Sequence, residues 1–507
     1  MTSSRIANTY RNMLFAMISQ ITTVLLTIAS RAVFVKTLNA EYMGTSGLFS
    51  NILSILSLAE LGVGTAITYS LYKPISDNNH ERIKSFMRLY KHIYWGIGCF
   101  IFIIGCILLP FIDSFIREKP NIPNLNLIFL LFVFQSSTTY FFSYKTQFLT
   151  ATQNDYILQK FKIAFTILQV TLQIGYLYIF REYLGFLLIG IIVPFMNNVL
   201  ASRYVDRLFP YLKEKAIPLT KDDLKPIKRN VFALFLYRVA QNLSATIDTL
   251  IVSKFIGIIE VAIYYNYHFL LSFANVLFTN ILGMIAPSLG NLLVSEANEK
   301  KVQIFETLQF VYYWIGTLMG VAIIVLFNTF IELWLGTDYL FNQTLVVALA
   351  VSSTVTNFQR PCAMMRDTGG LFWYGRYRPV ASSIINIVAS VCFVKFYGVI
   401  GVVMGTVLSK LLTYAWYDPY IVFKYAISSS LKRYYYRYLS NWCIFGFLAY
   451  LCDYLYKQTN TTGTVHGLII GACIVVFVVN GFFYLFFRHS YGYIYLKDNF
   501  FKKILNV

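Results

Sequence analysis

The chain has 507 residues, of which 57% are hydrophobic and only 13% are charged, and its mean hydropathy is +0.60. Soluble domains carry about 25% charged residues, so this composition excludes a soluble enzyme, a secreted disulfide scaffold and a disordered chain. The formal net charge of +19 would suggest a nucleic-acid partner in a soluble protein. In a membrane protein, basic loops on the cytoplasmic side explain the same excess.

Apolar segments long enough to cross a bilayer recur along the whole chain. They predict an all-α polytopic membrane protein with about fourteen transmembrane helices. The expected spans cover 11–36, 45–72, 86–112, 124–150, 156–180, 184–205, 229–254, 260–292, 303–330, 341–362, 372–395, 398–423, 437–456 and 463–487. Pro120 and Pro123 mark a break between the third and fourth spans, and Arg181–Tyr183 alone separate the fifth from the sixth. The latter spacing predicts a tight helical hairpin.

The distribution of Lys and Arg predicts the orientation. With the N-terminus inside, cytoplasmic loops and helix ends hold 31 of the 42 basic residues, and the opposite side holds 7. This asymmetry indicates that both termini are cytoplasmic. The outer loops are all short, which disfavours a membrane-bound glycosyltransferase or polymerase with a large catalytic loop.

Three short similarities recur at nearly one spacing. Arg11-Asn12 opens the first span and Arg229-Asn230 the seventh, segment 76–83 resembles 295–302, and 137–145 resembles 352–360. Because each pair has the same place in the topology, we infer a parallel repeat of about 215 residues. The expected domains are an N-lobe of six helices at 1–208, a cytoplasmic linker at 209–228, a C-lobe of six helices at 229–430, and two further helices with a cytoplasmic tail at 431–507.

One segment carries a family resemblance. Residues 30–67 read SRAVFVKTLNAEYMGTSGLFSNILSILSLAELGVGTAI and lead into YSLYKPI at 69–75. This stretch resembles the first two helices of the Wzx-type polysaccharide repeat-unit flippases of the MOP exporter superfamily. The resemblance covers about residues 10–90, and the plan of six, six and two helices extends it to a MOP/MATE-like fold.

The resemblance implies a function and a location. Wzx-type flippases move undecaprenyl-diphosphate-linked oligosaccharides across the bacterial plasma membrane for capsule, exopolysaccharide or O-antigen assembly. It therefore implies a lipid-linked oligosaccharide as substrate, membrane lipids as surroundings, and the polysaccharide polymerase and chain-length machinery as partners. A MATE-type drug exporter and a flippase for teichoic-acid or peptidoglycan precursors remain as alternatives.

Charged side chains inside the predicted spans are the candidate site. They are the basic residues Arg31, Lys145, Arg238 and Lys410 and the acids Glu60 and Asp248. A charge at mid-bilayer costs about 2.5–3.5 kcal/mol on the insertion scale, so each should face a wet cavity or a partner. Because four bases oppose two acids, we expect a positive interior that suits a diphosphate. Arg31, Arg238 and Lys410 would line a cavity between the lobes, where alternating access carries the substrate.

Other roles remain open for several of these residues. Lys145 lies near the inner end of its span, so an interfacial anchor competes with substrate binding. Glu60 and Asp248 suit either ion coupling or structural pairs with the bases. His268, among aromatic residues, suits a packed position, and Gly401 with Gly405 predicts close helix packing.

Catalytic signatures are absent from the sequence. It contains no phosphate-binding loop of the Walker type, no zinc-binding motif and no paired acids suited to glycosyl chemistry. We therefore expect no enzyme and no cofactor. Energy would come from an ion or substrate gradient, with coupling to protons or sodium left open.

Overall fold

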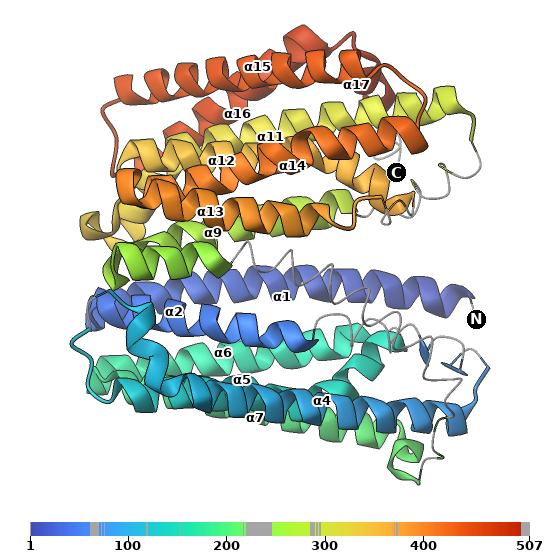
Figure 1. Cartoon of the computed structure of the whole chain (residues 1–507), viewed down its shortest axis with the longest axis vertical. Coiled ribbons are helices and arrows are strands. Elements are labelled where there is room, and N and C mark those ends of the chain that lie inside the picture. The colour runs from blue at the N-terminus through green and yellow to red at the C-terminus, as the bar shows by residue number, and fades with distance from the viewer. Residues whose placement is uncertain are drawn as a thin grey trace. The chain divides into compact units, whose positions relative to one another are not determined.

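The computed structural model describes residues 2–60, 77–117, 120–152, 154–215, 246–283, 296–369 and 374–497, with a few isolated positions between them. Helices make up all of the regular secondary structure in these ranges, as the sequence predicts. The chain forms two compact units, Met1–Ala262 and Ile263–Val507, each built from long helices (Figure 1).

Among the described residues, six long α-helices and three short 3₁₀ turns lie wholly within unit 1. They are α1 (Thr2–Thr37), α2 (Ala40–Leu56), η1 (Ser57–Glu60), α4 (His80–Leu108), η2 (Leu109–Phe115), α5 (Leu125–Ala151), α6 (Asp155–Phe180), α7 (Tyr183–Leu208) and η3 (Pro210–Lys213). A described helical segment at 246–255 follows, and α9 (Ile258–Gly283) begins in this unit.

Unit 2 holds most of α9 and the later helices. These are α11 (Asn298–Leu335), η4 (Thr337–Tyr339), α12 (Gln343–Thr368), α13 (Arg378–Tyr397), α14 (Val399–Tyr425), α15 (Leu431–Gln458), α16 (Val465–Phe487) and α17 (Tyr491–Leu496). α15 and α16 occupy the positions of the two predicted additional spans.

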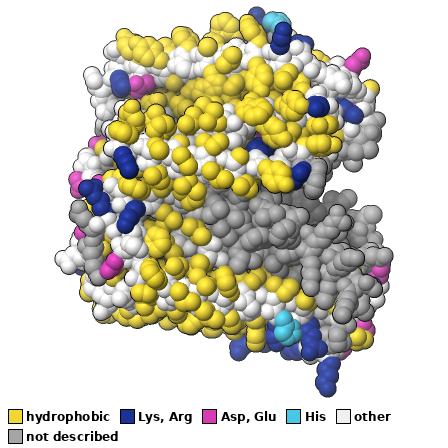
Figure 2. Space-filling view, in the orientation of Figure 1, with side chains coloured by type: hydrophobic (Ala, Val, Ile, Leu, Met, Phe, Trp, Pro, Cys, Tyr) yellow, Lys and Arg dark blue, Asp and Glu magenta, His cyan; other side chains and the backbone are white. Residues whose placement is uncertain are grey.

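Nine helices in the described ranges are long and apolar enough to cross a membrane. α2, α12 and α15 occupy predicted spans too, but α2 has only 17 residues, and α12 and α15 carry more polar side chains. Figure 2 shows hydrophobic side chains spread over much of the visible surface, with Lys and Arg mainly near helix ends. An exterior of this kind is stable in lipid, where apolar side chains face hydrocarbon.

The predicted breaks between helices are confirmed. α6 ends at Phe180 and α7 begins at Tyr183, with Arg181 in the left-handed conformation at φ 51° and its N–H bonded to the Leu177 carbonyl. α5 likewise begins one residue after Asn124, whose φ is 57°. A left-handed residue directly after the last turn, as Arg181 is for α6, ends one helix and redirects the chain within a few residues.

The packing of helices repeats in the two units. In unit 1, α4 packs on α5, α5 on α7 and α7 on α6; in unit 2, α11 packs on α12, α12 on α14 and α14 on α13. α11 also contacts α15, α16 and α17. This shared order supports the duplicated arrangement inferred from the sequence.

Gly401 and Gly405 allow α13 and α14 to approach closely, as the sequence predicts. A Cβ atom at Gly405 would collide with the backbone of Ser390, and one at Gly401 would collide with the Phe393 carbonyl. Ser390 Oγ donates a hydrogen bond of 3.2 Å to the Val402 carbonyl across the same contact. The absence of side chains at these two positions therefore sets the separation of the two helices.

Candidate functional site

The structure places Lys145 in an ion pair near one end of unit 1. Its Nζ lies 2.7 Å from Oδ2 of Asp206, so that α5 is joined to α7. The two side chains are 20% and 16% exposed, and the Tyr144 ring lies 5.9 Å from the Lys145 nitrogen. Sequence analysis did not foresee this partner, because Asp206 lies just beyond the predicted sixth span.

Lys410 lies near the middle of α14 in unit 2. Its Nζ donates a hydrogen bond of 2.8 Å to Oγ1 of Thr356 on α12, and that hydroxyl donates to the Ser352 carbonyl at 2.9 Å. His268 on α9 lies close enough to interact electrostatically with Lys410. The lysine is half-buried. Its positive charge therefore lies near the middle of a long helix of unit 2.

Glu60 ends the 3₁₀ turn η1 and contacts tyrosines of the neighbouring helices. The Tyr94 hydroxyl donates to Glu60 Oε1 at 2.9 Å, and Tyr140 also interacts electrostatically with this carboxylate. The Tyr94 and Tyr140 rings lie 6.2 Å apart and belong to a core cluster with Tyr90. The sequence indicates that Glu60 is at membrane depth but not that tyrosines surround it.

The remaining predicted residues are less well defined. Arg31 lies half-buried on α1, and Asp248 is 5% exposed in the helical segment at 246–255; each contacts at least one neighbour. Arg238 lies outside the described residues. Arg31, Lys145, Glu60 and Asp248 belong to unit 1, and Lys410 belongs to unit 2. Lys145 contacts Asp206, and Glu60 contacts Tyr94.

A buried charge cluster in unit 2 corrects the count of interior charges. Asp418 of α14 is fully buried, and its Oδ1 accepts from Arg366 Nη1 of α12 at 2.7 Å and pairs with Arg378 Nη1 at the start of α13. Arg366 and Arg378 are only 2% and 5% exposed. From the sequence, both arginines were assigned to a basic cluster at cytoplasmic loops and helix ends, and Asp418 was not among the expected interior acids. The structure places the arginines at the ends of α12 and α13 and pairs them with Asp418.

The cluster has a second acid at its edge. Arg366 also pairs with Asp367, whose side chain is 42% exposed, at 2.5 Å, and the Arg378 guanidinium lies 4.2 Å from the Tyr414 ring centre. Asp418 Oδ2 and Arg378 Nε have no hydrogen-bond partner in the described part of the chain. Two buried guanidiniums thus share one fully buried carboxylate.

The two ion pairs occupy corresponding places in the duplicated fold. Lys145 and Asp206 join α5 to α7, and Arg366 and Asp418 join α12 to α14. Arg366 follows Lys145, and Asp418 follows Asp206, at nearly the predicted repeat of about 215 residues. In each unit, an ion pair between a base and an acid therefore joins the two corresponding helices. The pair in unit 2 is the more deeply buried.

Comparison with known proteins identifies the fold. No family model matches the chain, and no curated protein matches it. The lipid II flippase MurJ in an inward closed conformation matches with a TM-score of 0.63 at 14% identity, over 94% of this chain and 99% of that one. An inward-facing multidrug resistance MATE transporter of the MOP superfamily matches with a TM-score of 0.61 at 15% identity, over 79% and 94%.

A third similar structure is a MOP superfamily transporter from Pyrococcus furiosus, described by the reversed polarity of its binding pocket. It matches with a TM-score of 0.52 at 16% identity, over 82% of this chain and 96% of that one. The helices and apolar exterior thus define a multi-pass membrane protein. Its fold is that of the MOP superfamily transporters.

Proposed function

We propose that this protein is a flippase that moves undecaprenyl-diphosphate-linked oligosaccharide repeat units across the bacterial plasma membrane by alternating access. The similarity to a lipid II flippase supports a lipid-linked substrate. The match to that flippase covers 94% of the chain, against 79% for the MATE transporter. The resemblance of residues 30–75 to Wzx-type flippases narrows the substrate to polysaccharide repeat units.

The observation that carries the proposal is the cation at the centre of α14. A lysine at this depth is costly in a lipid-facing position, so its location there suits a polar translocation path. Lys410 and Arg31, together with Arg238, would bind the diphosphate or acidic sugars, because phosphate oxygens accept strong hydrogen bonds from cationic donors. Lys145 would serve the same path or anchor α5 through Asp206.

Other parts of the proposal follow from the same assignment. Glu60 and Asp248 would couple transport to ions or stabilise the helix packing. Both termini would be cytoplasmic, and the polysaccharide polymerase and chain-length machinery would receive the exported unit. The transporter from Pyrococcus furiosus is described by a binding pocket of reverse polarity that suggests a different function, so pocket polarity differs among proteins of this fold.

A deletion strain tests the proposal. Loss of the gene should cause an undecaprenyl-diphosphate-linked oligosaccharide to accumulate on the cytoplasmic leaflet, and the wild-type gene should reverse this. Lys410→Ala at equal expression should fail to reverse it, whereas Lys457→Ala, at an exposed lysine, should succeed. Drug sensitivity without lipid accumulation would instead indicate a MATE-type exporter. Accumulation of a teichoic-acid or peptidoglycan precursor would change the substrate assignment.

A further inference from the structure

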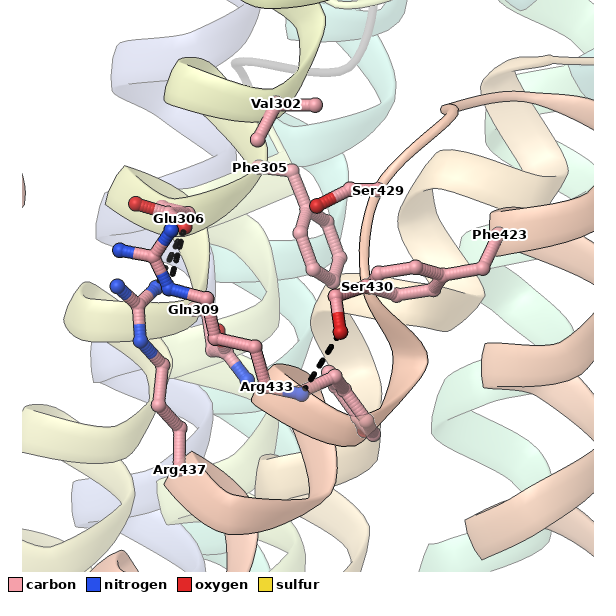
Figure 3. A pocket seen from close by; sticks show the side chains of 10 residues that line it. Val302, Phe305, Glu306, Gln309, Phe423, Ser429, Ser430, Arg433 and Arg437 are labelled. Atoms are coloured by element: carbon pink, nitrogen blue, oxygen red, sulfur yellow. Dashed lines mark hydrogen bonds and ion pairs between the residues drawn. The ribbon is translucent and has the colours of Figure 1, made fainter.

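A shallow pocket lies in unit 2 where α11, α14 and α15 meet, and the proposed transport path does not use it. Its empty volume is about 230 Å³, part of which is open to solvent. Its polar lining, much of which Figure 3 shows, consists of Glu306, Gln309, Ser429, Ser430, Arg433 and Arg437. We call this the α11–α15 pocket.

The rim of the α11–α15 pocket is held in place by paired hydrogen bonds. Asn298 Nδ2 donates to the Ser428 carbonyl at 2.8 Å, and the Ser428 N–H donates to Asn298 Oδ1 at 2.8 Å. Ser430 Oγ then caps α15 by accepting from the Arg433 N–H at 3.4 Å. The loop between α14 and α15 is thereby fixed to the start of α11, so the pocket is formed before any ligand binds.

The charges of the pocket favour an anion. Arg433 and Arg437 converge on one carboxylate, with Arg433 Nε 3.7 Å and Arg437 Nη1 2.9 Å from Glu306 Oε1 (Figure 3). Each guanidinium has five N–H donors, so most of these donors are not used by the shared carboxylate. A helix N-terminus carries a partial positive charge. The first turn of α15 contains no acid that would offset this charge. An added anion would relieve this accumulation of positive charge.

The side chains around the pocket place it at a membrane surface. On the outer side of α15, Tyr436 is 76% exposed and Leu439 is 62% exposed, and exposed apolar residues continue along the helix to Phe447 and Tyr450. Tyrosine is enriched at the boundary between lipid and water. Because Arg433 and Arg437 lie at the start of this apolar surface, they are at the depth of lipid headgroups.

We propose that the α11–α15 pocket binds the phosphodiester of an anionic phospholipid headgroup. Arg433 and Arg437 donate hydrogen bonds to its phosphate oxygens, and guanidinium groups suit this role because they present parallel donors. Ser429 is placed to donate a further hydrogen bond from the rim. The acyl chains lie along the exposed apolar side of α15. The lipid thereby fixes α15 against α11.

Lipid retention by the full-length protein tests the site. The protein is purified from nanodiscs that contain equal amounts of phosphatidylglycerol and phosphatidylcholine, and the bound lipid is counted by native mass spectrometry. Arg433→Gln with Arg437→Gln should reduce retained phosphatidylglycerol about tenfold, as expected when one charge-assisted bond or more is lost. Lys424→Gln with Lys432→Gln removes the same charge outside the pocket and should leave retention within about twofold. Equal losses in both double variants would overturn the proposal.

Two further measurements separate the remaining explanations. Glu306→Gln keeps both arginines and removes their competing carboxylate, so it should raise phosphatidylglycerol retention several-fold; a reduced or unchanged value would contradict the proposal even if the arginine variant unfolds. Inorganic phosphate is the second probe. If phosphate alone binds the pocket and displaces phosphatidylglycerol at millimolar concentration, the site belongs to a soluble phosphate and the lipid assignment is wrong.

Discussion

Removal of the Asp418 carboxylate should destabilise unit 2 strongly. Asp418→Asn leaves Arg366 and Arg378, which are 2% and 5% exposed, without their shared buried anion. Removing one member of a buried ion pair costs about 3–5 kcal/mol, because the remaining charge is left uncompensated. The two guanidiniums would also repel each other, so the upper part of this range is expected.

The corresponding pair in unit 1 provides a matched control. Asp206→Asn also removes an acid that joins two helices, but its pair with Lys145 is 20% and 16% exposed and therefore less deeply buried than the Asp418 cluster. The loss on breaking an ion pair falls as the pair becomes more exposed, to about 1 kcal/mol or less for pairs at the surface. Reversible unfolding in mixed detergent micelles should therefore show a loss at least twice as large for Asp418→Asn as for Asp206→Asn. Equal losses of unfolding free energy in the two variants would refute the reasoning. An unfolding free energy of Asp418→Asn within about 0.5 kcal/mol of the wild-type value would refute it too.

Two further substitutions test the packing of the helices. Gly405→Ala places a Cβ against the Ser390 backbone and should cost about 1–3 kcal/mol of unfolding free energy by overpacking. Gly446→Ala, with open space around it, should leave the unfolding free energy unchanged in the same assay. Equal effects of the two substitutions would contradict the close approach of α13 and α14. Tyr94→Phe removes the hydroxyl that donates to Glu60 and should cost about 1–3 kcal/mol of unfolding free energy. A neutral Tyr94→Phe would show that this hydrogen bond does not hold η1 in place.

Much of the fold could be predicted because lipid imposes simple rules on the sequence. A spanning helix must be long and apolar, so composition alone located α4, α5, α6, α7, α11, α13, α14 and α16 approximately. The hairpin at Arg181 followed from a gap too short for any other connection. Gly401 and Gly405 were informative because small residues four positions apart form one face of a helix.

The buried charge cluster shows where this reasoning fails. Arg366 lies near the end of α12, beyond the predicted span at 341–362, and Arg378 begins α13, inside the predicted span at 372–395. Only the packing of α12, α13 and α14 shows that both side chains reach Asp418. A signal was present nevertheless, since Asp418 interrupts the predicted span at 398–423 and an acid at that depth requires a cationic partner.

The site residues divide in the same way. The sequence could select Lys145, Glu60 and Lys410 because charges are rare in apolar segments. It could not supply their partners Asp206, Tyr94 and Thr356, because these lie on other helices at distant positions in the chain. The substrate-binding role of the selected residues and the predicted domain boundaries stay predictions.

Transport in a reconstituted membrane tests the central claim most directly. The purified protein is placed in liposomes that carry an undecaprenyl-diphosphate-linked oligosaccharide, and its accessibility on the outer leaflet is followed with a glycan-cleaving enzyme. We expect rapid movement between leaflets with wild-type protein, at least about tenfold slower movement with Lys410→Ala, and unchanged movement with Lys457→Ala. The absence of lipid movement by a folded wild-type protein that instead moves a cationic drug would contradict the account.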